Sequence, residues 1–148
     1  MMLRQLFRSA KPLDVWLKEY ATSHKNATNK RIHYVCVPII FLTIVALLTH
    51  ISWWLAVGIS VLALWFYVRL SVSLAVAMLV FIVLCFGAAL LPVNAWFWAA
   101  VFAIAWVGQF VGHKIEGAKP SFFEDLQFLL IGPAWVAMNV LGKTPKTA

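Results

Sequence analysis

Four long apolar runs, separated by very short polar connections, dominate the pattern of this chain. The runs cover approximately residues 34–49, 51–68, 70–91 and 93–111. Each is close to the ~20 residues that an α-helix needs to cross a hydrocarbon core about 30 Å thick. The connections are His50, Arg69 and Pro92, and turns this tight force consecutive helices to run antiparallel. The pattern therefore predicts four transmembrane helices in two closely joined hairpins.

Amphipathic segments flank the four runs. In residues 12–24 the apolar side chains recur at helical spacing and form one face: Leu13, Trp16, Leu17 and Tyr20. The segment 121–141 opens with Ser121 and Glu124 in an S-x-x-E capping box, and Gly132-Pro133 is expected to break the helix begun there. The apolar piece beyond that break is too short to span a bilayer. We expect an interfacial helix before the runs and an interfacial or re-entrant helix after them.

The composition agrees with a membrane protein. Of 148 residues, 64% are hydrophobic and only 11% are charged, which is more apolar surface than a soluble domain of this length can bury. We predict a single all-α integral membrane domain over residues 1–148, a four-helix transmembrane bundle with N-terminal and C-terminal interfacial helices. Nothing in the sequence sets its oligomeric state. Seven of the twelve Lys and Arg residues precede Ile32, which is typical of a membrane-orienting signal and argues against nucleic acid as a partner.

The same basic residues predict an orientation. All twelve fall on one side of the predicted hairpins, and the turns at His50 and Pro92 carry none. Tryptophans flank these two turns, as an aromatic belt at the far interface would: Trp53, Trp54, Trp96 and Trp98. The positive-inside rule then predicts that both termini are cytoplasmic. The membrane would be the inner membrane of a bacterium or, for a eukaryotic chain, that of the endoplasmic reticulum.

Three of the four histidines are gathered by this topology. His33 falls at the cytoplasmic mouth of the first span, His113 at the cytoplasmic end of the fourth, and His24 on the apolar face of the first amphipathic helix. His50 is 17 residues from His33, roughly 25 Å along a helix, so it cannot share a mononuclear site with them. Imidazole is the commonest protein metal ligand. The positions predict a metal site formed by His24, His33 and His113.

Polar residues at helical spacing surround the predicted site. Gln109 precedes His113 by four residues, Glu116 follows it by three, and Asn29 precedes His33 by four. Three imidazoles with one nearby carboxylate suit Fe(II), Zn(II) or Mn(II). Gln109 and Asn29 would orient the imidazoles from behind by hydrogen bonding, and Glu116 is a candidate fourth ligand.

Other interpretations of these residues stay open at this point. A histidine at a membrane interface can be merely solvated or capping, which is the interpretation we keep for His50, and Glu116 can simply balance nearby lysines. The chain could then be a non-catalytic lipid-binding or scaffold protein. A metal-dependent lipid enzyme of another kind, such as a zinc hydrolase, is a further alternative. A transporter or channel is disfavoured because the middle of every span lacks ionisable residues.

Two signatures in the chain resemble those of a known family. The first is His24-Lys25-Asn26-Ala27-Thr28-Asn29-Lys30-Arg31-Ile32-His33, followed by Val37-Pro38. The second is Gln109-Phe110-Val111-Gly112-His113-Lys114-Ile115-Glu116, followed by Lys119-Pro120. In this order they are similar to the membrane-bound 2-hydroxy fatty acid dioxygenases of the fungal α-oxidation type, a family with bacterial members. The similarity covers nearly the whole chain.

The resemblance implies an Fe(II)-dependent dioxygenase that uses molecular oxygen to shorten a 2-hydroxy fatty acid by one carbon. The motif histidines of the family carry over onto His24, His33 and His113, which are then expected to be the catalytic iron ligands. A 2-hydroxy acid can chelate iron through its carboxylate and hydroxyl, and its acyl tail would run between the spans or into the bilayer. Basic side chains would steer its anionic head to this edge: Lys25, Lys30, Arg31 and Lys114.

Overall fold

The computed structural model describes residues 11–143, and within them it contains helices only. The elements are α2 (Leu13–Ala21), α3 (Ala27–Ile51), α4 (Trp53–Leu70), α5 (Val72–Ala89), α6 (Ala95–Glu116), the 3-10 turn η1 (Ser121–Phe123) and α7 (Phe128–Val140). Four of them, α3 to α6, are long and apolar enough to cross a membrane. The predicted class, an all-α protein with four membrane-spanning helices, is confirmed.

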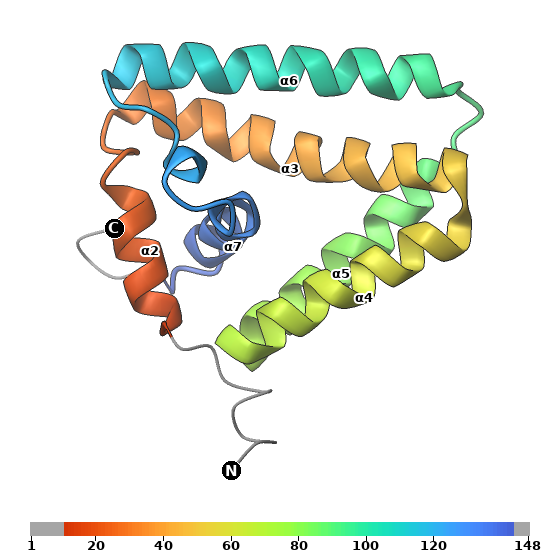
Figure 1. Ribbon diagram of the computed structural model, residues 1–148, viewed down its shortest axis with the longest axis horizontal. Helices are drawn as coiled ribbons and strands as arrows, with labels where there is room; N and C mark the ends of the chain where they lie inside the picture. The colour runs from red at the N-terminus through yellow and green to blue at the C-terminus, as the bar shows by residue number, and fades with distance from the viewer. Residues whose placement is uncertain (1–10, 144–148) are drawn as a thin grey trace.

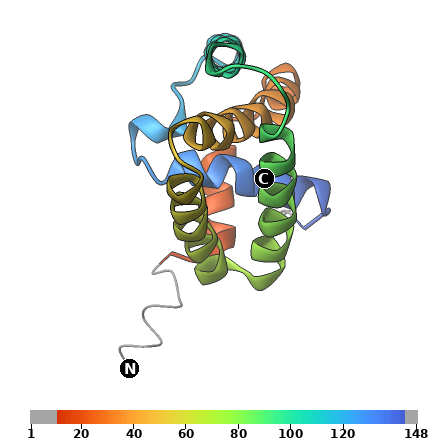
Figure 2. The ribbon, with the colours of Figure 1, turned by 90° about the vertical axis from the view of Figure 1, so that its right-hand side faces the viewer.

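The four long helices form two pairs that diverge from one another (Figure 1). Helices α3 and α6 run antiparallel and pack side by side along their length, whereas α4 and α5 form a second pair that leans away from α3. The shorter helices α2 and α7 fill the space between the two pairs at one end (Figures 1 and 2). The histidine-bearing segments come together at this same end.

Small residues let α6 approach α3 closely. A Cβ added to Gly108 would lie 2.8 Å from Sγ of Cys36, and one added to Gly112 would overlap Oδ1 of Asn29. Membrane helices lack a hydrophobic drive to associate, so they use such small-residue faces for close van der Waals packing. Gly108 and Gly112, four residues apart on α6, therefore set the distance between the two helices that carry His33 and His113.

The first long helix begins earlier than predicted. It starts at Ala27 rather than near residue 34, because the side chain of Asn26 accepts hydrogen bonds from the backbone N–H groups of Thr28 and Asn29 and caps it. The first amphipathic helix ends earlier, at Ala21 instead of residue 24. His33 is consequently well inside a helix, and His24 lies outside one.

Serine caps, rather than the predicted residues, mark two of the turns. Ser52 separates α3 from α4 and Ser71 separates α4 from α5, and each hydroxyl accepts a hydrogen bond from the backbone N–H three residues on. The predicted turn residues His50 and Arg69 lie in the last turns of the helices just before them. Hydropathy alone does not locate a turn to the residue, because helix ends vary by one or two residues without changing the apolar run.

Two predictions for the C-terminal segment were wrong. Ser121 does not cap a helix, because it begins the short turn η1 and its hydroxyl bonds Ser23 instead. Helix α7 is not broken at Gly132-Pro133 but runs through Pro133 to Val140. The cost of an interior proline is offset by burial of the whole stretch Ile131–Val136, since tertiary packing supplies most helix stability in proteins.

Helix α7 is the centre of the core. Trp135 and Ile131 are fully buried and pack with Trp16, Leu17 and Tyr20 of α2 and with residues of α4 and α5. The buried hydroxyl of Tyr67, on α4, donates to the Leu130 carbonyl at 2.8 Å. This packing holds α2 against the spanning helices and so places the loop between α2 and α3.

Candidate metal site

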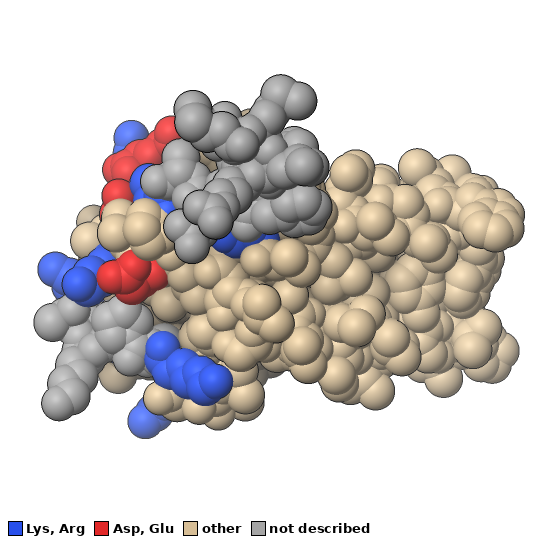
Figure 3. Space-filling view, turned by 90° about the horizontal axis from the view of Figure 1, so that it is seen from below, with Lys and Arg blue, Asp and Glu red and all other residues tan. Residues whose placement is uncertain are grey.

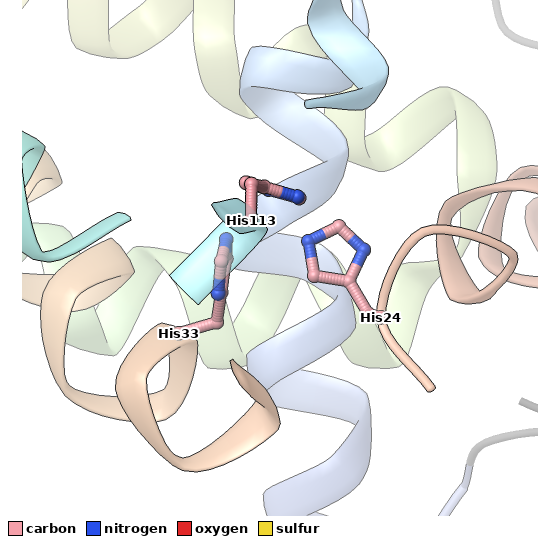
Figure 4. A group of neighbouring side chains, drawn as sticks. All are labelled: His24, His33 and His113. Carbon is pink, nitrogen blue, oxygen red and sulfur yellow. The ribbon is translucent and has the colours of Figure 1, made fainter. Parts of the chain in front are cut away.

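Three imidazoles from three separate segments converge at the end where α2, α3 and α6 meet. His24 comes from the loop between α2 and α3, His33 from α3 and His113 from α6, and their side chains point toward one another (Figure 4). One nitrogen from each ring lies within 4.8 Å of the other two. The side chains are buried, with only 1%, 0% and 5% of their surfaces exposed.

The two helical histidines are held by their helices. Nδ1 of His33 lies 3.0 Å from the backbone carbonyl of Asn29, one turn earlier in α3, and donates to it. His113 follows Gly112, where α6 packs closely on Asn29 of α3, and its ring lies beside that of His33 with centroids 4.7 Å apart. Helix register and the close packing of α3 on α6 thus place both rings.

His24 is held by contacts outside any helix. Its Nδ1 lies 2.7 Å from the backbone carbonyl of Tyr20 at the end of α2, and its ring stacks on that of Tyr20 with centroids 4.0 Å apart. Trp135 of α7 packs on the same ring. Burial and, to a smaller extent, the neighbouring His33 lower the pKa of the His24 imidazole from its ordinary 6.5 to about 3. His24 is therefore neutral at physiological pH, which is the form that binds metals.

The remaining ring nitrogens fit a metal ion. Nε2 of His24, Nε2 of His33 and Nδ1 of His113 are buried and have no hydrogen-bond partner among the described residues. Buried polar atoms are nearly always paired, so three unpaired nitrogens in neighbouring rings call for a ligand. In His24 and His33 the opposite nitrogen donates to a backbone carbonyl, which fixes the tautomer with a free Nε2, as in most protein metal sites.

The carboxylate of Glu116 has another partner in the structure. It accepts hydrogen bonds from the backbone N–H groups of Lys25 and Asn26, at 2.5 and 2.6 Å. These contacts tie the end of α6 to the loop that carries His24. The group of ligating atoms that could hold a metal comprises the three histidines and does not include Glu116.

The two predicted amide neighbours lie at the site but differ in role. The side chain of Asn29 donates to the Ser23 carbonyl at 3.2 Å, and it is the backbone of Asn29 that hydrogen-bonds His33. Gln109 lines the same cavity as His24 and His113 and lies beside the His33 ring. His50 is exposed at the far end of α3 and takes no part.

The basic residues singled out for substrate steering lie at the histidine end of the molecule. Lys25, Arg31 and Lys114 are exposed there, and Lys30 is partly buried with its charge close enough to influence His24. The space-filling view shows the same arrangement, with the visible charged side chains at one end and an uncharged surface toward the other (Figure 3). Acidic as well as basic side chains are visible at this end (Figure 3).

A cavity of about 110 Å³ opens beside the histidines. Its polar lining residues are His24, His113, Gln109, Ser121 and Tyr20. The rest of the wall is apolar, and α3 supplies its longest stretch, formed by Val37, Ile40, Phe41 and Ile44. Aromatic and aliphatic side chains of α6, η1 and α7 complete the wall: Trp106, Phe122, Phe128 and Leu129. The cavity therefore joins a polar end at the imidazoles to an apolar wall along α3. Such a shape suits a molecule with a polar head and a hydrocarbon tail.

Sequence reasoning missed two residues at the site, Ser23 and Ser121. Ser23 lies 3.1 Å from Nδ1 of His24, and Ser121 lies 2.6 Å from Ser23. Ser23 adjoins a predicted ligand in the sequence, which is the one signal that pointed to it. Nothing in the sequence pairs it with Ser121, 98 residues away.

Comparison with known proteins gives a family match. The model of a protein family described as 2-hydroxy-palmitic acid dioxygenase Mpo1-like matches residues 10–69 and 69–144. No curated protein and no solved structure matches the chain. The two matched segments together contain all three converging histidines.

Proposed function

The chain belongs to the 2-hydroxy-palmitic acid dioxygenase Mpo1-like family, and from this membership we propose that it is an Fe(II)-dependent dioxygenase that shortens 2-hydroxy fatty acids by one carbon. One observation carries the proposal: three buried imidazoles with unpartnered nitrogens, one nitrogen of each within 4.8 Å of the others, lie beside an apolar cavity. A shortening of this kind balances if the 2-hydroxy acid and O₂ give the acid one carbon shorter, CO₂ and water.

His24, His33 and His113 would hold the metal. Three neutral imidazoles on one side leave positions open for other molecules, and iron bound there would supply the redox chemistry that oxygen requires. Burial keeps the His24 imidazole neutral, and the Tyr20 and Asn29 carbonyls fix the tautomers of His24 and His33. Glu116 would support this set by holding the loop that carries His24, since its carboxylate is bonded to backbone N–H groups.

The substrate would lie with its head at the imidazoles and its tail along α3. The apolar wall reaches Ile44, which is 11 residues beyond His33 and therefore roughly 16 Å further along the helix. A long acyl chain would continue past this wall into the bilayer. Gln109, at the polar end, would offer its amide to the hydroxyl or carboxylate of the head, and Lys30 would attract the negative charge.

The test is oxygen uptake by protein purified anaerobically, loaded with iron and supplied with 2-hydroxypalmitate. We expect oxygen consumption and a product one carbon shorter, and neither with palmitate. His24→Ala, His33→Ala and His113→Ala should each lose metal and activity. His50→Ala, which changes the one exposed histidine at the far end, is the matched control and should behave as wild type. Folded variants of the three site histidines that still bind iron and turn over normally would refute the assignment.

A hydrolase with zinc in the same site is the second candidate. It is favoured by the donor set itself, because three histidines also form catalytic zinc sites that keep an open position. Elemental analysis and oxygen dependence separate the two candidates. Zinc in the purified protein, with lipid turnover that continues without oxygen, would replace the dioxygenase proposal.

We further propose that the histidine end faces the cytoplasm, together with both termini. The support is the gathering of charged side chains at this end and the uncharged opposite end (Figure 3), in keeping with the positive-inside rule. Reporter fusions at the two termini and an inserted tag in the loop between α5 and α6 test the orientation. Termini reported as extracytoplasmic would overturn it.

A further inference from the structure

Two serines connect the segment after α6 to the first of the three histidines. The hydroxyl oxygens of Ser121 and Ser23 lie 2.6 Å apart. Oγ of Ser23 also lies 3.1 Å from Nδ1 of His24 and 3.3 Å from the Tyr20 carbonyl. Both serine side chains are buried, at 7% and 8% exposed. The hydrogen bonds therefore run through the protein interior from η1 to the imidazole.

These hydrogen bonds are mutually compatible in one arrangement. Nδ1–H of His24 is shared between the Tyr20 carbonyl and Ser23 Oγ, the Ser23 hydroxyl donates to the Tyr20 carbonyl, and the Ser121 hydroxyl donates to Ser23 Oγ. Nε2 of His24 then carries no proton and stays free for a metal. The same nitrogen has no partner among the residues that the structure describes.

His24 needs such support more than the other two histidines. His33 and His113 lie within α3 and α6, whose backbones fix their positions, whereas His24 lies between the end of α2 at Ala21 and the start of α3 at Ala27. A side chain on a loop is placed by tertiary contacts. Groups hydrogen-bonded to the non-ligating nitrogen of a histidine commonly set its tautomer and ring orientation.

We propose that Ser121 is a positioning residue for His24 and acts through Ser23. The inference rests on the proposed function, because it takes His24 to be a metal ligand. Ser121 also lines the cavity and begins η1, whose Phe122 packs on Trp106 of α6. The segment that forms one wall of the cavity thus also orients a ligand 97 residues earlier in the chain.

Because Ser121 lines the cavity, its replacement would also alter contacts with a substrate. Metal binding in the absence of substrate is therefore the informative measurement. The full-length protein in detergent micelles is titrated with Co(II) against a competing chelator, and the visible absorption spectrum of bound Co(II) reports the geometry of its ligands. The variants are Ser121→Ala, Ser23→Ala and the double variant.

Ser73→Ala is the matched control. The hydroxyls of Ser71 and Ser73 form a similar pair, 3.0 Å apart, at the start of α5 and away from the site. Ser71 caps α5, so removal of the Ser73 hydroxyl breaks the pair and leaves the cap. We expect Ser73→Ala to bind Co(II) as wild type does.

We expect each site variant to weaken Co(II) binding about ten-fold, the lower end of the usual effect of losing a group that supports a ligand, and to change the Co(II) spectrum. The double variant should be no worse than either single variant, because both serines act through one connection. Unchanged affinity and spectrum in Ser121→Ala, additive losses, or an equal loss in Ser73→Ala would overturn the inference. Should Ser121→Ala not fold, Ser23→Ala decides by the same criteria.

Failure of this inference can be told apart from failure of the proposed function. Wild-type protein that binds no Co(II) and no iron overturns both. Wild-type protein that consumes oxygen with iron, together with serine variants that bind Co(II) normally, overturns the inference alone. Serine-dependent Co(II) binding without oxygen consumption under any iron loading supports the inference and refutes the dioxygenase proposal.

Discussion

Replacement of Gly112 by alanine should push α6 away from α3 and disturb the candidate metal site. The added Cβ would come closer than 3.0 Å to Oδ1 of Asn29, a separation that real Cβ atoms essentially never show. Asn29 cannot easily yield, because its side chain is fully buried and donates to the Ser23 carbonyl. The helix itself must therefore move, and His113 is the next residue along it.

The size of the effect is set by two opposing contributions. Overpacking a tight site typically costs about 1–3 kcal/mol, and replacing a helical glycine by alanine returns about 1 kcal/mol of helix propensity. Gly87→Ala in α5 makes the same chemical change where nothing lies within 4 Å of the new atom. The propensity gain cancels between the two variants, so Gly112→Ala should be about 1–3 kcal/mol less stable than Gly87→Ala.

Thermal unfolding in detergent, followed by circular dichroism, measures the difference, and chelator competition measures metal affinity. We expect Gly112→Ala to unfold at a lower temperature and bind metal more weakly than Gly87→Ala. Adding Asn29→Ala removes the group that the new methyl would meet, so the double variant should lose less than the sum of the single losses. Equal stability and metal affinity in the two glycine variants would refute the close-packing argument.

Three further predictions concern the surroundings of the site. Glu116→Gln should weaken metal binding several-fold, because it loosens the loop that carries His24, whereas the exposed control Glu124→Gln should leave metal affinity unchanged. Equal metal affinity in the two variants would show that Glu116 does not support the site. Tyr67→Phe should lower the free energy of unfolding by about 1 kcal/mol, because it removes the hydrogen bond to the Leu130 carbonyl, and an unchanged melting temperature would contradict this. In the metal-free protein, the pKa of His24 is about 3 in the folded state and the ordinary 6.5 in the unfolded state. Between these two pH values the unfolded state binds more protons than the folded state, so the free energy of unfolding falls as the pH drops from 6.5 toward 3. His24→Gln should flatten this pH dependence in a denaturation series, and an equal slope in the variant would show that His24 does not cause it.

The membrane-spanning class could be predicted because it rests on a local property. An apolar run of sufficient length has few alternatives to a spanning helix, whatever its neighbours do. The start of α3 was misplaced for the opposite reason. The residues from Ala27 to Arg31 are polar enough to suggest a connection, but Asn26 caps them into the first turns of the helix. Asparagine is a good helix cap, yet it is equally common in turns, so its presence alone did not decide between the two.

The gathering of the histidines could be predicted from topology, whereas their support could not. Spans of similar length that alternate in direction bring His33 and His113 to one end, and the number of spans between these two residues is enough to predict this. The contacts that place His24 join residues 98 and 91 positions apart, Ser23 with Ser121 and Lys25 with Glu116. No periodicity encodes pairs at such separations, since they depend on how η1 and the end of α6 fold back over the loop.

The loop between α2 and α3 is therefore the part of the site most open to tuning by distant changes. His33 and His113 are fixed by helices that pack through Gly108 and Gly112, so a change elsewhere reaches them only by moving a whole helix. His24 depends on individual hydrogen bonds and on its stacking with Tyr20. Substitutions in η1 or near Glu116 should consequently alter the geometry of one ligand while leaving the other two in place.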